Sequence, residues 1–316
     1  MDDAVGDVRT IRHSTGLDIL AWRDLGGGFT KNLALQTAQS VVVARIHSQT
    51  TSLERVRAEQ MARAALAVAG VPAVVATDLT LLPDGRVLEL EPFVNATEKM
   101  KTPSTLTTGA WVLGRLHDVL AAGGFPDEAR SVRWSHHAPA ERVIATAQAL
   151  TELAQVSDDV PVSLAAALLD HAQHLSDLEE PLLSHRVVQL THGDYWDDNV
   201  LFRRNAVAAV LDFGFLAARA RVDDLALPFW FWLLEPDHGP LGAQDDALLA
   251  SLVAAYDDST HRPLNRYERR ALPLAVARQP FWTAELCLLD PARARRHVRR
   301  LKRELPVAHQ AITRWT

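Results

Sequence analysis

The chain is nearly devoid of cysteine: Cys287 is the only one among 316 residues, so no disulfide can form within the chain. This cysteine usage is typical of a reducing compartment and predicts a cytoplasmic protein. No uninterrupted apolar run approaches the roughly 20 residues of a membrane helix. Residues 1–7 carry acids instead of the apolar stretch of a secretory signal. We therefore expect neither a membrane span nor a leader peptide.

An excess of positive charge is also absent. The chain has 33 Lys and Arg against 39 Asp and Glu, a formal net charge of −6, which does not favour a nucleic-acid partner. The basic stretch 293–303 is better explained as the solvated face of a helix. His136 and His137 are adjacent, so they lack the spacing of metal ligands on one helix face, and we assign them no metal role.

The two halves of the chain have different patterns. Residues 17–90 contain short apolar, β-branched segments separated by turn residues, with one helical pattern at 53–69. After Pro92 the pattern is mainly helical, interrupted by a short strand and a hairpin between residues 187 and 212. We expect an α+β, bilobal fold. Its parts are a β-rich N-terminal lobe with a five-stranded antiparallel sheet and one helix (1–94) and a larger, mainly helical C-terminal lobe (95–316).

The most informative segment reads Thr-His-Gly-Asp-Tyr-Trp-Asp-Asp-Asn and spans residues 191–199. Phosphoryl transfer needs an aimed acceptor oxygen and cations that spread the developing charge. Asp194 can accept the proton of a hydroxyl. Asn199 and Asp212 offer the oxygen ligands that Mg²⁺ prefers, and the intervening hairpin brings them to one end of adjacent strands. The spacing predicts phosphoryl transfer to a hydroxyl group.

This pattern, His-Gly-Asp, four residues, Asn, and then Asp-Phe-Gly after a hairpin, resembles the aminoglycoside phosphotransferase and choline kinase-like family, which shares the protein-kinase fold. The resemblance implies ATP or GTP as phosphoryl donor, Asp194 as catalytic base or hydroxyl orienter, and Asn199 and Asp212 as Mg²⁺ ligands. It also implies structural roles for two further residues: His192 shapes the catalytic loop, and Asp224 braces it.

A nucleotide site is expected between the two lobes. Glycines at 26–28 let backbone N–H groups approach phosphates, although a simple hairpin turn is the alternative. Residues 91–94 would form the hinge that holds the purine edge. Pro92 has no N–H, so Phe93 is the expected donor. The predicted nucleotide contacts are Gly27, Gly28, Phe29, Thr30, Arg45, Glu59, Glu91, Phe93 and Leu201.

Among these contacts, Arg45 stands where the family has a basic residue on a strand, and Glu59 stands where it has the helix carboxylate that pairs with it. The resemblance implies an Arg45–Glu59 pair beside the phosphates; arginine can bridge two phosphate oxygens. The alternatives are that Arg45 is an exposed strand residue and that Glu59 binds Arg55 or Arg63 on its own helix.

The acceptor is expected to be a small molecule. Asp224 follows Asp212 by only twelve positions, which leaves no room for the activation segment that holds a peptide in protein kinases. Residues 223–260 contain eight acids and no Lys or Arg. They would suit a cationic acceptor, such as an aminoglycoside, another antibiotic or an amino-sugar intermediate, or would form a solvated acidic face. The predicted acceptor contacts are Asp197, Asp198, Asp223, Trp230, Glu235, Asp237 and Glu285.

Two other functions share the catalytic residues. The first is a metabolic kinase of choline, homoserine, thiamine or a sugar, which would differ only in its acceptor pocket. The second is a nucleotide-binding pseudokinase that works as a partner module; the presence of Asp194, Asn199 and Asp212 argues against it. The sequence does not predict the oligomeric state.

Overall fold

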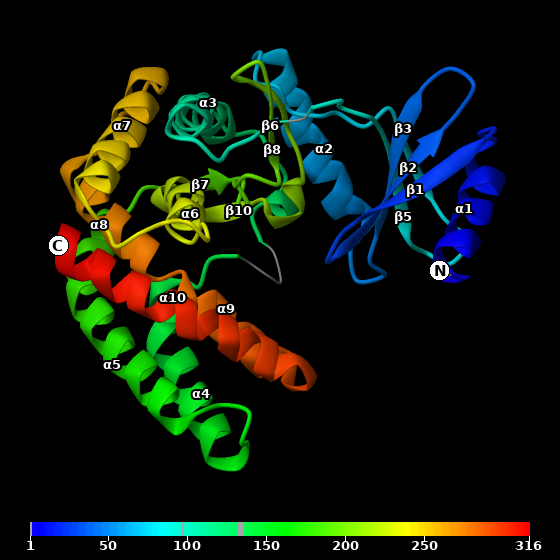
Figure 1. The fold of residues 1–316 in the computed structure, drawn as a ribbon. Coiled ribbons are helices and arrows are strands. Elements are labelled where there is room, and N and C mark those ends of the chain that lie inside the picture. The colour runs from blue at the N-terminus through cyan, green and yellow to red at the C-terminus, as the bar shows by residue number, and fades with distance from the viewer. Residues whose placement is uncertain (1, 97, 132–135) are drawn as a thin grey trace.

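The computed structural model describes residues 2–96, 98–131 and 136–316. Figure 1 shows two parts side by side, a small β-sheet flanked by two helices and a larger, mainly helical part. The predicted α+β, protein-kinase-like fold is therefore confirmed. The predicted lobe boundary after residue 94 falls in the connection between strands β5 and β6. No helix among the described residues is both long and apolar enough to cross a bilayer.

The small part contains the five-stranded sheet that the sequence predicts, with every neighbouring pair antiparallel. In spatial order its strands are β1 (Ala21–Gly26), β2 (Thr30–Gln36), β3 (Val41–His47), β5 (Val87–Pro92) and β4 (Asp78–Leu81). Helix α1 (Asp2–Thr15) lies on one side of the sheet and α2 (Leu53–Val68) on the other (Figure 1).

The two faces of this sheet are chemically different because side chains alternate along a strand. In β5, Leu88 and Leu90 belong to a hydrophobic cluster that includes Ile11 of α1. The intervening Glu89 and Glu91 are also buried, but they form ion pairs on the side of α2. The sheet therefore has one apolar face, covered by α1, and one charged face, covered by α2.

The charged face is a layer of paired groups between the sheet and α2. Arg63 of α2 binds the carboxylates of Glu89 and Glu91, and Nε2 of His47 lies 2.7 Å from Glu89. Burial would raise the pKa of Glu89, but His47 and Arg63 outweigh it and lower that pKa to about 2. Removing one partner of such a buried pair costs roughly 3–5 kcal/mol, so the layer fixes α2 against the sheet.

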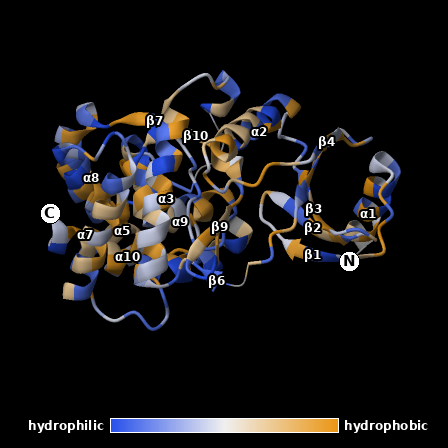
Figure 2. Ribbon diagram, turned by 90° about the horizontal axis from the view of Figure 1, so that it is seen from above, coloured by the Kyte–Doolittle hydropathy of each residue, from blue (hydrophilic) through white to orange (hydrophobic). Residues whose placement is uncertain are grey.

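The larger part surrounds a second, more extensive hydrophobic core, which also receives the apolar face of α2. Its helices are α3 (Pro103–Ala121), α4 (Val143–Val156), α5 (Val162–Glu179), α6 (Val222–Leu233), α7 (Ala243–Ser259), α8 (Arg266–Ala277), α9 (Pro280–Leu289) and α10 (Ala294–Trp315). Figure 2 shows hydrophobic and hydrophilic residues interspersed along these helices, most of which have both buried and exposed residues, whereas α6 and α9 are buried almost throughout.

Two small antiparallel arrays carry the predicted catalytic segment. Strand β7 (Val188–Thr191) pairs with β10 (Ala217–Ala220), and β8 (Val200–Arg203) pairs with both β9 (Ala206–Val210) and β6 (Glu98–Lys99). Arg204 and Asn205 join β8 to β9 with φ of 52° and 61°, as a tight hairpin turn requires. The predicted hairpin between the catalytic segment and Asp212 is thus present.

Helix α1 is the main element that the sequence analysis missed. Ala4, Val8 and Ile11 recur at helical spacing, but the sequence analysis used the acidic residues around them only as an argument against a leader peptide. The predicted first strand also differs, because it begins at Ala21 and not at Leu17. Residues 17–20 belong to the connection between α1 and the sheet, so β1 begins only after them.

Because Ile11 is fully buried against the sheet, we expect Ile11→Ala to lower the free energy of unfolding by about 2–5 kcal/mol. Val5→Ala on the same helix should change it by less than about 0.5 kcal/mol, because Val5 is exposed. Urea unfolding of both variants measures the difference. Equal effects would mean that α1 does not pack on the sheet.

Candidate active site

Asp224, at the start of α6, fixes the backbone of the catalytic segment. Its Oδ2 accepts a hydrogen bond from the backbone N–H of His192 and its Oδ1 from that of Gly193, both at 2.7 Å. His117 adds a contact of 3.0 Å to Oδ2. Burial would raise the pKa of Asp224, but the His117 hydrogen bond and the nearby histidines outweigh it and lower the pKa to about 2. This geometry suits the bracing role predicted for Asp224.

His192 and Gly193 set the shape of the turn that follows β7. Nε2 of His192 lies 2.8 Å from the carbonyl of Leu211, and its Nδ1 accepts the Asp194 N–H at 3.2 Å. Gly193 has φ of 79°, which glycine adopts without strain. A Cβ on Gly193 would lie 2.1 Å from Nη1 of Arg219, so only glycine fits this position.

The three predicted catalytic residues converge as their spacing suggested. Nδ2 of Asn199 donates to Oδ2 of Asp194 at 2.6 Å and to the Asp194 carbonyl at 2.9 Å. These two bonds use both amide hydrogens and leave Oδ1 of Asn199 as its remaining ligand atom. Asp212, Asp194 and Asn199 all line one cavity.

Asp212 occupies a strained backbone position immediately after the hairpin. Its φ is 55° and its ψ is 76°, which is uncommon for a residue with a side chain. Oδ1 accepts the Gly214 N–H at 3.3 Å and a hydrogen bond from Nη2 of Arg45 at 2.8 Å. Burial would raise the pKa of Asp212, but the Arg45 charge and hydrogen bond outweigh it and lower the pKa. Asp212 is therefore held as a carboxylate.

The donor set fits a divalent cation of the Mg²⁺ type. Oδ1 of Asn199 and the second carboxylate oxygen of Asp212 are hard oxygen ligands in the same cavity. Within residues 2–96, 98–131 and 136–316, no group of three His, Cys, Asp or Glu could hold a metal ion. A cation here would thus complete its shell with water and substrate phosphates, as Mg²⁺ commonly does.

The predicted Arg45–Glu59 pair is wrong. Arg45 binds Asp212, and its Nε lies 3.7 Å from Glu91. Glu59 instead accepts a hydrogen bond of 2.6 Å from Nε of Arg55, one turn earlier on α2, which was one of the alternatives. The physical reason is the charged layer: Arg45 already has carboxylates from Asp212 and, on the neighbouring strand, Glu91, so a further carboxylate from α2 is not needed there.

Arg55 also ties α2 to the loop after Asp212. Its guanidinium donates to the carbonyls of Gly214 at 3.1 Å and Leu216 at 2.7 Å. A second branch donates to the carbonyls of Glu128 and Ser131 in the larger part. Arg55 thus joins α2 of the small part to two loops of the larger part.

The cavity has a volume of about 640 Å³ and lies between the glycine turn and the catalytic segment. Phe29 of the turn meets Phe215 edge-on, with ring centroids 5.6 Å apart, so the turn reaches the loop after Asp212. The predicted nucleotide residues that line the cavity are Gly27, Gly28, Phe29, Thr30 and Glu59. The predicted nucleotide residues that do not line it are Arg45, Glu91, Phe93 and Leu201.

The hinge does not present the predicted purine donor. The Phe93 N–H donates to the carbonyl of Val41 at 3.4 Å, which extends the pairing of β3 with β5. The Glu91 side chain is buried and binds Arg63 and Arg45. The sequence predicted a strand that ends at Leu90, whereas β5 continues to Pro92 and its pairing with β3 reaches Phe93, which engages the N–H group.

The predicted acidic wall for the acceptor is wrong, because the protein itself neutralises most of the acids. Asp223 binds Arg278, Asp257 binds Arg269 and Asp246 binds Arg314. Among the predicted acceptor contacts, Asp198 binds Lys99, Asp197 and Glu235 share Lys101, and Glu285 lies 3.3 Å from Arg142. The sequence could not show these pairs because their basic partners lie outside residues 223–260. Of the seven predicted acceptor residues, only Asp198 lines the cavity.

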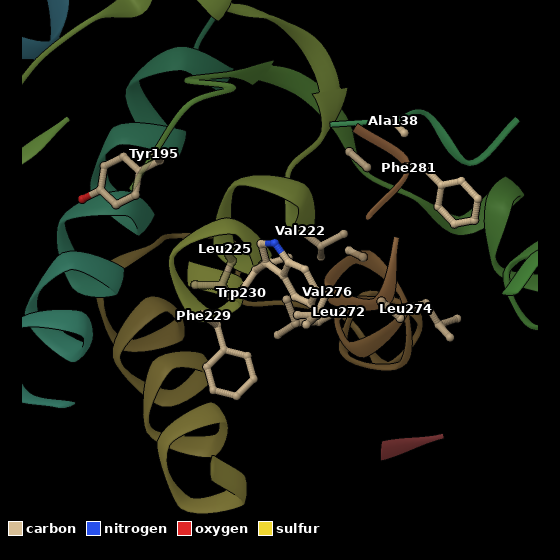
Figure 3. Close-up of a cluster of buried hydrophobic side chains, with 14 of the residues drawn as sticks. Ala138, Tyr195, Val222, Leu225, Phe229, Trp230, Leu272, Leu274, Val276 and Phe281 are labelled. Atoms are coloured by element: carbon tan, nitrogen blue, oxygen red, sulfur yellow. The ribbon is translucent and has the colours of Figure 1, made fainter. Parts of the chain in front are cut away.

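Trp230 cannot cover a ligand as predicted. Its side chain is 1% exposed and lies in the core between α6 and α8, near Val222, Leu272 and Val276 (Figure 3). Asp237, at the other extreme, is exposed in the loop after α6. The four consecutive aromatics at 229–232 therefore belong mostly to the packing of α6.

Three residues near Asp194 escaped the sequence analysis: His136, Trp196 and Phe215, all of which line the cavity. Nδ1 of His136 touches Oδ1 of Asp194, and its ring stacks on Phe215 with centroids 5.0 Å apart. Trp196 and Phe215 could have been found, since each stands within three residues of a predicted catalytic residue. His136 carries no such signal, because it is 58 residues from Asp194.

We expect Gly193→Ala to destabilise the fold by at least about 1–3 kcal/mol, because alanine is strained at this φ and its Cβ meets Arg219 and the Phe215 carbonyl. Gly239→Ala is the matched control, since nothing lies within 4 Å of its added Cβ. Thermal and urea unfolding measure both. A Gly193→Ala variant as stable as the control would contradict the described turn.

Comparison with solved structures supports the fold. An aminopropanol kinase associated with a microcompartment superposes with a TM-score of 0.71 at 17% identity, over 98% of each chain. An amicoumacin kinase in complex with AMP-PNP and Ca²⁺ superposes with a TM-score of 0.70 at 12% identity, over 98% of this chain and 97% of that one. At these identities the likeness concerns the fold alone.

Sequence comparison adds the family. A homoserine kinase of Phenylobacterium zucineum is 36% identical over 83 residues, which is 26% of this chain and 24% of the relative. A homoserine kinase of a Methylobacterium species is 33% identical over 118 residues, 37% of this chain and 34% of the relative. The chain thus matches only about a quarter to a third of these relatives' lengths. The profile of the Phosphotransferase enzyme family, by contrast, matches residues 21–272, so the chain belongs to that family.

Proposed function

We propose that this phosphotransferase moves the γ-phosphoryl group of ATP, or of GTP, to a hydroxyl of a small, amine-bearing alcohol, with Mg²⁺ as the cation. Phosphoryl transfer is supported by the family; the nucleotide donor, the hydroxyl acceptor and Mg²⁺ are the proposed parts. The cytoplasmic location that the single cysteine predicts is part of the same proposal.

One observation carries the proposal: the glycine turn and the three acidic or amide residues of the catalytic centre line a single cavity. Gly27 and Gly28 line it together with Asp194, Asn199 and Asp212. Phosphates held by the turn would therefore lie next to the two Mg²⁺ ligands. A hydroxyl at Asp194 would then face the terminal phosphate, the arrangement that phosphoryl transfer needs.

The chemistry of the chain's own residues is limited to positioning and proton transfer. Asp194 accepts the hydroxyl proton as the hydroxyl oxygen bonds to the γ-phosphorus and the diphosphate leaves. Asn199 fixes Asp194 through its two amide hydrogen bonds. Arg45 binds the carboxylate of Asp212, which keeps this carboxylate charged and fixes its orientation. A bound Mg²⁺ supplies the charge neutralisation that the phosphates require.

The acceptor class rests on the cavity wall and on the relatives. Trp196 and Phe215 line the cavity beside His136, and aromatic faces attract ammonium groups. Homoserine and aminopropanol, named for two relatives, are small alcohols with an amine. The loss of the acidic wall weakens the case for a polycationic aminoglycoside. We therefore favour a small amino alcohol, with choline, thiamine, sugars, amino sugars and aminoglycosides as alternatives in the same assay.

We expect Asp194→Ala to lower turnover by roughly 10²- to 10⁴-fold, because it removes the carboxylate assigned to accept the hydroxyl proton. Nucleotide affinity should change little. Asp158→Ala is the control, since Asp158 is exposed and lies outside the cavity, and it should keep full activity. Coupled detection of ADP and mass spectrometry of the acceptor measure the effect.

The acceptor panel for this assay contains small amino alcohols, amino sugars, aminoglycosides and a neutral sugar. Turnover confined to amine-bearing alcohols supports the proposal. Full activity in Asp194→Ala would contradict the catalytic assignment. Turnover with the neutral sugar alone would contradict the acceptor class but leave the phosphotransfer chemistry in place.

A further inference from the structure

His136 makes a contact that the catalytic assignment does not require. Nδ1 of His136 touches Oδ1 of Asp194, while Asn199 binds Oδ2 at 2.6 Å. Oδ1 is buried and forms no regular hydrogen bond with any residue of the described ranges, so the His136 contact is what covers it. Both oxygens of the catalytic carboxylate are therefore occupied by the protein's own nitrogen atoms.

The contact is held in place by aromatic packing. The His136 ring stacks on Phe215 with an interplanar angle of 29°, and its centroid lies 4.9 Å from that of Trp282 and 6.4 Å from that of Trp196. These three neighbours come from different parts of the larger lobe. The side chain is nevertheless 21% exposed and lines the cavity, so it borders open space on one side. A ring in this setting can turn away from Asp194 without breaking the core.

An incoming hydroxyl needs the oxygen that His136 covers. Oδ2 already accepts the amide of Asn199, which also stands among the proposed Mg²⁺ ligands. Oδ1 is buried with Nδ1 of His136 against it, so a hydroxyl that binds Oδ1 displaces Nδ1. Water could do the same, and it would then react: its oxygen would bond to the γ-phosphorus, the bond from phosphorus to the β-phosphate oxygen would break, ADP would leave, and the water proton would pass to Asp194.

We propose that His136 is a positioning residue that covers Asp194 until an acceptor displaces it, and so suppresses transfer of the phosphoryl group to water. Water gains too little from the aromatic wall to displace the ring. An acceptor with further contacts to Trp196, Phe215 or Trp282 can displace it. This inference rests on the proposed phosphotransfer at Asp194 and adds a specificity function to that same site.

The test compares His136→Ala with His136→Asn. Both variants lose the ring, but the Asn amide nitrogen can take the place of Nδ1 and keep the contact with Asp194. We expect His136→Ala to raise acceptor-independent ATP hydrolysis roughly tenfold, as fits the loss of a close polar contact worth about 1.4 kcal/mol, and to lower the acceptor KM. His136→Asn should hydrolyse ATP as slowly as the unaltered chain. His13→Ala, on the exposed side of α1, controls for nonspecific effects.

The outcomes separate this inference from the proposed function. If the unaltered chain phosphorylates an acceptor but both His136 variants hydrolyse ATP at its rate, the inference is wrong and the proposed function stands. An equal rise in both variants, or an equal fall of hydrolysis and coupled turnover, would assign His136 to packing alone and overturn the inference. If the unaltered chain turns over no acceptor at all, the proposed function fails and the inference fails with it.

Discussion

The architecture depends on the way in which buried Arg45 is neutralised. A guanidinium in the interior needs carboxylates with good geometry, since an unpaired buried charge costs several kcal/mol. Glu91 on the neighbouring strand supplies one, and Asp212 from the larger lobe supplies the other at 2.8 Å. Burial alone would lower the pKa of Arg45, but these carboxylates outweigh it and raise the pKa. The ion pair between Arg45 and Asp212 therefore joins the sheet to the catalytic loop, because separating the two would leave a buried charge unpaired.

This arrangement changes the way in which helix α2 contributes to the site. Because Glu91 already serves Arg45, Glu59 is left to bind Arg55. Arg55 in turn grips the carbonyls that follow Asp212. Helix α2 thus contacts the loop after Asp212 through the Arg55 guanidinium and backbone carbonyls. Arg45 and Arg55 both bind the segment that begins at Asp212. Asp224 fixes the catalytic segment by accepting hydrogen bonds from the backbone N–H groups of that segment.

What the sequence predicts well is set by local spacing. The interval from Asp194 to Asn199 and the hairpin before Asp212 fixed their convergence, because strand geometry leaves few alternatives. The sheet followed from short apolar, β-branched segments separated by turn residues. The failures involve partners distant in sequence. Glu59 had three possible basic partners, and the acids after Asp223 are neutralised by arginines and lysines elsewhere. The contact of His136 with Asp194 depends on a loop whose path no periodicity reveals.

The central claim is that Asp212, anchored by Arg45, holds a divalent cation against the phosphates of the nucleotide. Isothermal titration of ATP with and without Mg²⁺, in the unaltered chain and in Asp212→Asn, tests it most directly. Asparagine can still accept the Arg45 hydrogen bond but lacks the charge. The account predicts that Mg²⁺ tightens ATP binding by roughly tenfold in the unaltered chain and has little effect in the variant. An equal Mg²⁺ effect in both proteins would contradict it.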